Sequence, residues 1–372
     1  MRRGVLLALA LSTAFLPCAV AQAKAPKITS LAVTFTVQNV NRSQVPCATD
    51  GATYNILGHV TGPQSKLVGS SRKKRRSGRV ATLYLHGLGL GEWFWNLRNQ
   101  LQPGGEPSGP RPGTLIKGYD YATALAKLGH TSVTIDRLGY GASGHPDGRR
   151  SCLGGQADVA HQVVQALKSG SYAVIGGNPV RFKRVALAGH SIGGEIAMIE
   201  AYSFRDVAAL IDVSFSAQNQ PRAQVALGPT RDTCLAGGEP VFQTGPPGYA
   251  YYGSPPVSDF KAIMFHSAPR VVTDAAGVLR NRDPCGDTDS IVPALLQQRV
   301  QVAKITVPVL VICGTRDVLF STLGCKIQSE RFTRSSRVTF QTVRNAGHAI
   351  ALEAPKATFR RKVARWLERL GF

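Results

Sequence analysis

The sequence has few acidic residues and no long apolar run beyond its first residues. It contains 22 Asp and Glu against 44 Lys and Arg, which gives a formal net charge of +22. Such a charge can draw a protein to anionic surfaces or nucleic acid. The basic residues are scattered, however, and the densest run, residues 72–76, lies among Ser and Gly as in a solvated loop. We therefore expect no specific nucleic-acid function and at most a loose association with anionic surfaces.

The first residues are typical of a signal peptide. Arg2 and Arg3 precede an apolar run over residues 5–16, and Ala21-Gln22-Ala23 places small residues where a signal peptidase cuts. The run is too short to span a bilayer comfortably, and a buried N-terminal helix is the alternative. We expect residues 1–23 to be a cleavable signal peptide and the mature protein to be secreted or periplasmic.

No two cysteines have the two-residue spacing of a zinc site, so no metal centre is expected. An even number of cysteines follows residue 23, which in an exported chain suggests up to three disulfides. The connectivity stays open among about 15 pairings, and free buried thiols are an alternative. Cys313–Cys325 and Cys234–Cys285 are plausible local pairs. They would leave Cys47 with Cys152.

Short apolar runs alternate with helical patterns over most of the chain. The runs predict strands at residues 80–85, 131–135, 185–188, 207–213, 307–312 and 337–343. Helical patterns cover residues 121–128, 156–167, 194–202 and 359–370. Alternating Thr, Val and Phe at residues 28–40 and 54–60 predict an antiparallel opening hairpin or edge. Strands that alternate with helices imply an α/β fold, with a mainly parallel central sheet and helices on both faces.

This alternation stops between residues 217 and 304. The segment is rich in Pro, Gly, Asp and Arg and shows no strand–helix alternation. Parallel sheets place their sites at the carboxyl ends of the strands. We interpret the segment as a cap inserted over those ends, which leaves residues 24–216 and 305–372 as the core.

Ser191 is the strongest candidate for a catalytic residue. It is the centre of a Gly-His-Ser-Ile-Gly motif that follows the predicted strand 185–188 and opens a helix. A serine is a poor nucleophile unless a base removes its proton and the backbone presents its hydroxyl to the substrate. A sharp strand-to-helix turn with flanking glycines provides that presentation. A Gly-rich turn with an incidental serine is the alternative.

His348 and Asp317 are the candidate base and orienting acid. His348 follows the last predicted strand, and Asp317 follows the strand before it. A carboxylate there would hold one imidazole nitrogen and stabilise the imidazolium that forms as Ser191 attacks. Asp212, embedded in a predicted strand, is the rival acid. The chain order Ser, Asp, His is the α/β-hydrolase order.

The oxyanion that develops in acyl transfer needs two N–H donors. The backbone N–H of Ile192, directly after the nucleophile, is one candidate. The other is the N–H of Leu88, in the loop that follows His86-Gly87. The neighbouring Trp93-Phe94-Trp95 could line an acyl pocket, but core aromatics are the favoured interpretation.

Together these motifs resemble the α/β-hydrolase superfamily, in particular its esterase- and lipase-like members with a cap. The resemblance covers residues 54–372 and rests on HG at 86–87, DRLGYGAS at 136–143, GHSIGG at 189–194, GTRD at 314–317 and GH at 347–348. It implies an α/β-hydrolase fold and a Ser191, Asp317 and His348 triad. It is weak as to substrate, since the superfamily also contains peptidases, thioesterases and carbon–carbon bond hydrolases.

The expected function is hydrolysis of a small-molecule carboxylic ester through an acyl-enzyme on Ser191. This chemistry needs no cofactor. A peptidase or amidase on the same triad is the alternative enzyme. An exported envelope-binding protein without turnover is the alternative that is not an enzyme. Substrate, acyl-chain length and oligomeric state are not determined by the sequence.

Overall fold

The computed structural model describes residues 26–372, apart from 69–78, 98–115, 219–220, 241–244 and 255. The predicted signal peptide (1–23) and the basic run at 72–76 therefore lie outside the described residues. Among the residues described, no helix is both long and apolar enough to cross a membrane.

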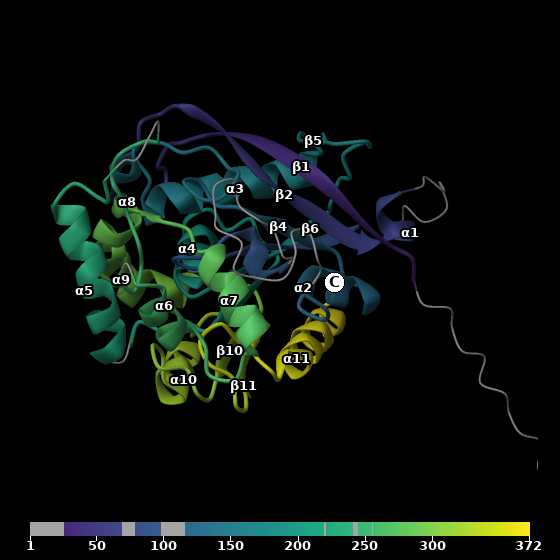
Figure 1. Ribbon diagram of the computed structural model, residues 1–372. Helices are drawn as coiled ribbons and strands as arrows, with labels where there is room; N and C mark the ends of the chain where they lie inside the picture. Colours follow the sequence, from purple (N-terminus) through teal and green to yellow (C-terminus); the bar gives the residue numbers. More distant parts are fainter. Residues whose placement is uncertain (1–25, 69–78, 98–115, 219–220, 241–244, 255) are drawn as a thin grey trace, which may run out of the picture.

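One sheet forms the centre of the molecule (Figure 1). Within the described residues it has nine strands in the order β11-β10-β7-β6-β3-β4-β2-β1-β5. The strands are β1 Ile28–Gln38, β2 Thr53–Pro63, β3 Val80–Leu85, β4 Ser132–Ile135, β5 Ala173–Val174, β6 Arg184–His190, β7 Ala209–Val213, β10 Val309–Gly314 and β11 Val338–Val343. Strands β4, β3, β6, β7, β10 and β11 pair in parallel, whereas β1 pairs antiparallel with β2 and β5, and β2 with β4. The mainly parallel sheet with an antiparallel opening hairpin is confirmed.

Helices cover both faces of this sheet. They are α2 Tyr121–Lys127, α3 Leu153–Ser169, α4 Ile192–Ser203, α10 Thr322–Glu330 and α11 Lys356–Arg369, with a short α1 at Gln64–Leu67. Helices α3 and α4 pack together against β6, whereas α2 and α11 pack against each other beside β4 and β11. Helix α11 buries Phe359, Val363 and Trp366 and exposes Arg361 and Arg365, because its apolar residues follow helical spacing.

The inserted segment, residues 217–304, lies between β7 and β10 in the chain and is mainly helical. Its elements are α5 Pro221–Leu235, β8 Tyr249–Ala250, α6 Val257–Met264, α7 Arg270–Val278, β9 Asp283–Pro284, α8 Cys285–Asp289, α9 Ile291–Gln301 and the 3₁₀ turn Val302–Lys304. These helices were not predicted, because prolines at their ends gave the segment the composition of a loop. Pro256, Pro269 and Pro284 each stand at the N-cap of a helix, where the missing N–H costs no intrahelical bond.

Three disulfides join Cys47 to Cys152, Cys234 to Cys285 and Cys313 to Cys325. They are the pairs that the chain positions suggested. The first ties the loop after β1 to the start of α3, and the second ties α5 to α8 within the inserted segment. The aromatic residues Trp93, Phe94 and Trp95 are buried, with Trp95 against Tyr84 and Tyr121, so their interpretation as core aromatics is confirmed.

Candidate active site

Ser191 lies between the end of β6 and the start of α4. Its backbone has φ +54° and ψ −128°, a conformation that residues with a side chain rarely adopt and that is found at functional sites. A Cβ on Gly189 would come within 1.9 Å of the Gly193 carbonyl oxygen, and one on Gly193 within 2.6 Å of the His86 carbonyl oxygen. Both glycines are therefore required for the turn that presents the Ser191 side chain.

His348 and Asp317 meet at the carboxyl ends of β11 and β10. His348 Nδ1 lies 2.9 Å from Asp317 Oδ2, and both side chains are buried. The other carboxylate oxygen, Asp317 Oδ1, accepts hydrogen bonds from the N–H groups of Leu319 (2.8 Å) and Phe320 (3.1 Å). The acid is thus held by its own loop in the orientation that pairs it with the imidazole.

The rival acid, Asp212, is in a different position. It is buried within β7, and neither of its carboxylate oxygens has a hydrogen-bond partner among the described residues. Burial raises the pKa of Asp212 well above its usual value, and the nearby charge of Glu195 raises it further. A buried carboxyl group that makes no hydrogen bond to an imidazole is not placed to orient a histidine. The structure pairs His348 with Asp317 instead.

A mostly apolar pocket brings three of the five predicted residues together, whereas Asp317 and His348 do not line it. Ser191 lines it beside Leu88 and Ile192, the residues predicted to donate to the oxyanion. Phe320 lines the same pocket, and its ring centroid is 5.7 Å from that of His348. His190, the neighbour of Ser191, also contacts the loop of His348, since its Nε2 lies 2.9 Å from the His348 carbonyl oxygen.

The loop after β3 passes directly against Ser191. A Cβ on Gly87 would lie 2.9 Å from Ser191 Cβ, so only glycine allows this approach. Gly89 has φ +68°, and its N–H donates to Asp283 Oδ1 of β9 over 2.6 Å. Asn281 N–H donates to the Gly89 carbonyl oxygen over 3.1 Å. The inserted segment therefore holds the loop that carries Leu88.

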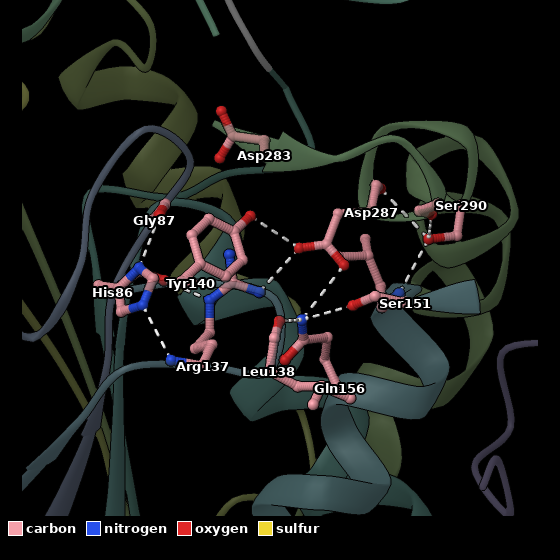
Figure 2. Close-up of polar contacts among 12 residues, drawn as sticks. His86, Gly87, Arg137, Leu138, Tyr140, Ser151, Gln156, Asp283, Asp287 and Ser290 are labelled. Atoms are coloured by element: carbon pink, nitrogen blue, oxygen red, sulfur yellow. Dashed lines mark hydrogen bonds and ion pairs between the residues drawn. The ribbon is translucent and has the colours of Figure 1, made fainter. Parts of the chain in front are cut away.

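His86 fixes this loop from the core side (Figure 2). The backbone N–H of Arg137 points at His86 Nε2, 3.1 Å away, so Nε2 must accept. The ring proton is then on Nδ1, which donates to the Gly87 carbonyl oxygen over 2.9 Å. Burial, and the Arg137 charge after it, lower the pKa of His86 well below its usual value. The imidazole stays neutral and holds the peptide that precedes Leu88.

Sequence reasoning did not find the buried network behind this loop (Figure 2). Arg137 donates to the His86 carbonyl oxygen through Nε (3.0 Å) and forms an ion pair with Asp287 through Nη1 (2.9 Å). Tyr140 donates to the same Asp287 oxygen over 2.9 Å. Gln156 Nε2 reaches the other oxygen over 3.4 Å and donates to the Leu138 carbonyl oxygen over 2.8 Å.

The sequence signal for this network was the DRLGYGAS motif at 136–143, which contains Arg137 and Tyr140 but not their acid partner. The acid lies 150 positions further along the chain, in the inserted segment. No local pattern could have identified it.

One group of described residues, His161, Glu200 and Asp206, could in principle hold a metal ion. A cation already lies there, because Lys168 Nζ is 3.7 Å from Asp206 Oδ2, and His161 Nδ1 is 3.1 Å from the same oxygen. The group is therefore an ion-pair cluster at the end of α4, and it carries no argument for a metal.

Comparisons with known proteins agree with the fold. The profile described as "Alpha/beta hydrolase family" matches residues 83–361. No curated protein sequence gives a match. A thermophilic esterase from Thermogutta terrifontis is similar in structure, with TM-score 0.57, 16% identity and coverage of 90% of this chain and 98% of that one. An enol-lactonase from Burkholderia xenovorans is similar with TM-score 0.56 and 15% identity, and the match covers 85% of this chain and 97% of that one. An esterase from Exiguobacterium antarcticum is similar with TM-score 0.55 and 16% identity, and the match covers 88% of this chain and 99% of that one.

Proposed function

Because the chain belongs to the alpha/beta hydrolase family, we propose that it is a serine hydrolase that cleaves carboxylic esters through an acyl-enzyme on Ser191. The observation that carries the proposal is the arrangement of one pocket. Ser191, in a strained turn, lines it, and Phe320 connects it to a buried His348–Asp317 pair.

In this mechanism His348 takes the proton of Ser191 as the hydroxyl oxygen attacks the ester carbonyl carbon. Asp317 holds Nδ1–H of His348, which leaves Nε2 to act as the base, and its charge stabilises the imidazolium. The imidazolium then protonates the leaving alcohol. Water, activated by the same histidine, releases the acid and restores Ser191.

The backbone N–H groups of Leu88 and Ile192 are the proposed donors to the tetrahedral oxyanion. Ile192 is the first residue of α4, so its N–H has no intrahelical partner and the helix dipole favours an anion there. Leu88 lies in the loop that His86 holds from one side and Asp283 from the other. Donors held in this way are oriented before the charge develops, which is the condition for strong stabilisation.

The pocket favours an apolar acyl group. Most of its lining is aliphatic or aromatic and comes from the core and from α5, α9 and the loop after β8 of the inserted segment: Leu88, Ile192, Phe215, Ala223, Leu227, Tyr252, Ile291, Leu295 and Phe320. Since the inserted segment contributes much of this lining, we propose that it is a cap and that it selects the acyl chain.

The direct test uses short p-nitrophenyl esters and a fluorophosphonate probe on the protein without residues 1–23. We expect the wild type to hydrolyse the esters and to take up the probe, and Ser191→Ala to do neither. A panel of esters and aminoacyl amides separates an esterase from a peptidase or amidase. Equal labelling of both proteins by the probe would show that Ser191 is not the nucleophile.

Export is also part of the proposal. The three disulfides are typical of a chain that folds outside the reducing cytosol. The test is expression of the full chain in a bacterial host, followed by fractionation and N-terminal sequencing of the product. We expect a product outside the cytoplasm that begins at Lys24, and a cytoplasmic product that begins at Met1 would contradict this.

A further inference from the structure

Glu195 is the one acidic residue among the described residues that line a mostly apolar pocket. It follows Ser191 by four positions, so it lies about one helical turn, roughly 6 Å, further along the axis of α4. Residues with this spacing share one face of a helix. Glu195 lines the same pocket as Ser191 and Leu88, although only 1% of the residue is exposed.

Only one of the two carboxyl oxygens of Glu195 has a hydrogen-bond partner among the described residues. Gln298 of α9 donates from Nε2 to Glu195 Oε2 over 2.6 Å. Glu195 Oε1 is buried and has no hydrogen-bond partner among the described residues. An unpartnered buried polar atom costs about 1–3 kcal/mol, and native proteins keep such atoms chiefly where a ligand or water completes them.

No described cation forms an ion pair with Glu195. The groups that face it electrostatically are Asp212 from β7, Tyr202 from its own helix and, more distantly, Arg331 after α10. Burial raises the pKa of Glu195 to about 8, so the carboxyl is protonated at neutral pH and can donate a hydrogen bond. Glu195 therefore brings a buried carboxyl to the wall of the pocket about one helical turn from the nucleophile, where Ser216 and Tyr252 also contribute hydroxyl groups.

We propose that Glu195 Oε1 donates a hydrogen bond to an oxygen on the acyl chain of the substrate. The preferred substrates are then esters of acids that carry a carbonyl or ether oxygen several bonds from the scissile group, in place of plain alkanoate esters. This inference rests on the proposed ester hydrolysis at Ser191 and adds the acid class to it. A polar group aimed at a substrate oxygen discriminates strongly, because an analogue without that oxygen leaves the donor unpaired.

The experiment compares matched p-nitrophenyl esters of equal chain length. Pentanoate, hexanoate and heptanoate esters are each paired with oxo analogues in which one methylene is replaced by a carbonyl at the fourth carbon or beyond, where it changes the reactivity of the ester itself little. The measured quantity is the ratio of kcat/KM for the oxo ester to that for the plain ester. We expect a ratio of about five to ten in the wild type at the best carbonyl position, the value of one hydrogen bond.

Three variants separate a specific contact from a general effect on the fold. Glu195→Met removes the donor at similar volume, and we expect the ratio to fall to about one. Glu195→Gln keeps an N–H donor and should keep most of the preference. Leu227→Met, an apolar exchange in the same pocket, is the matched control and should leave the ratio unchanged. Thermal unfolding of each variant verifies that it is folded.

The pH dependence gives a second readout. As Glu195 ionises above about pH 8, the donor is lost, so the wild-type ratio should fall with rising pH. The Glu195→Gln ratio should stay constant because the amide does not titrate, and the neighbours Asp212, Tyr202 and Arg331 are the same in both proteins.

The two proposals fail in different ways. No ester hydrolysis by the wild type would contradict the function at Ser191. Hydrolysis with a ratio near one at every carbonyl position, or with a ratio that Glu195→Met does not change, would overturn the role of Glu195 alone. Such a result would mean that a water molecule completes Oε1.

Discussion

Ser191 depends on residues that have no functional group of their own. Its positive φ is stable only because the turn around it is fully constrained, by Gly189 and Gly193 on either side and by Gly87 across from it. Each of these glycines has backbone or a site residue where a Cβ would be. The chemistry of the serine thus follows from close packing at a few positions.

Asp317 is the residue whose proposed role is easiest to isolate. Asp317→Asn keeps the shape of the side chain but replaces an acceptor by an amide that can donate to His348 Nδ1. The imidazole would then adopt the wrong tautomer, and its charged form would lose its partner. We expect kcat to fall by roughly 10³–10⁴-fold with little change in KM, measured on a short p-nitrophenyl ester.

Asp212→Asn is the matched control, since it removes a buried carboxyl that does not contact His348. We expect its kcat to stay within a few-fold of the wild type. If Asp212→Asn lost activity and Asp317→Asn kept it, the assignment of the acid would have to be reversed.

At the scale of elements, the inserted segment contacts the loop that carries the proposed oxyanion donor. Strand β9 contributes Asp283, whose two carboxylate oxygens accept from the N–H groups of Gly89 (2.6 Å) and Tyr252 (3.2 Å). Helix α8 contributes Asp287, which is paired with the buried Arg137. Through these two acids, β9 and α8 are attached to the core beside the site.

Asp283 predicts a specific dependence of stability on pH. Burial raises its pKa to about 7, against about 4 in the unfolded chain. The native state therefore holds one more proton than the unfolded state between these values, and stability is lost as pH rises through this window. Asp283→Asn can still accept from Gly89 N–H but does not titrate. We expect it to gain stability relative to the wild type between pH 4 and pH 7, measured by urea unfolding.

The comparison needs only the difference between the two proteins, because all other titrating groups are shared. A difference in unfolding free energy that does not vary with pH would mean that Asp283 is ionised in the native protein throughout.

At the scale of the whole molecule, charge and crosslinks have separate roles. The chain has a net charge of +22, but no Lys or Arg is among the described residues that line the pocket, and this lining is mostly apolar. The disulfides, in contrast, tie distant parts of the chain. Cys47–Cys152 closes a loop of 105 residues, whereas Cys313–Cys325 closes one of 12.

Loop length predicts that these two disulfides differ in their effect on stability. In the chain-entropy account, closing a loop of about 100 residues contributes about 4.7 kcal/mol and a short loop about 3 kcal/mol. We expect the double variant Cys47→Ser/Cys152→Ser to lose about 2 kcal/mol more than Cys313→Ser/Cys325→Ser, by denaturant unfolding at neutral pH. Equal losses would indicate that native packing around the bonds outweighs the entropy of the unfolded chain.

The sequence by itself determined the sheet, its parallel part and the turn at Ser191. Runs such as residues 185–188 are apolar because strands in a parallel sheet are buried on both faces, and that periodicity is local. The motif around Ser191 is equally local, since the glycines that it requires are two residues away. The order of Ser191, Asp317 and His348, after the strands β6, β10 and β11, was also visible in the chain, and the structure brings His348 and Asp317 into contact.

Only the tertiary structure decided what surrounds these residues. The helices of the inserted segment were not visible, because the prolines that cap them gave the segment the composition of a loop. The partners Arg137 and Asp287, and Gly89 and Asp283, lie 150 and 194 positions apart. The half-satisfied carboxyl of Glu195 was equally hidden, since burial and a missing partner are properties of packing. Local sequence encodes dihedral preferences and periodic burial, whereas pairing between distant buried charges is set only when the whole chain has packed.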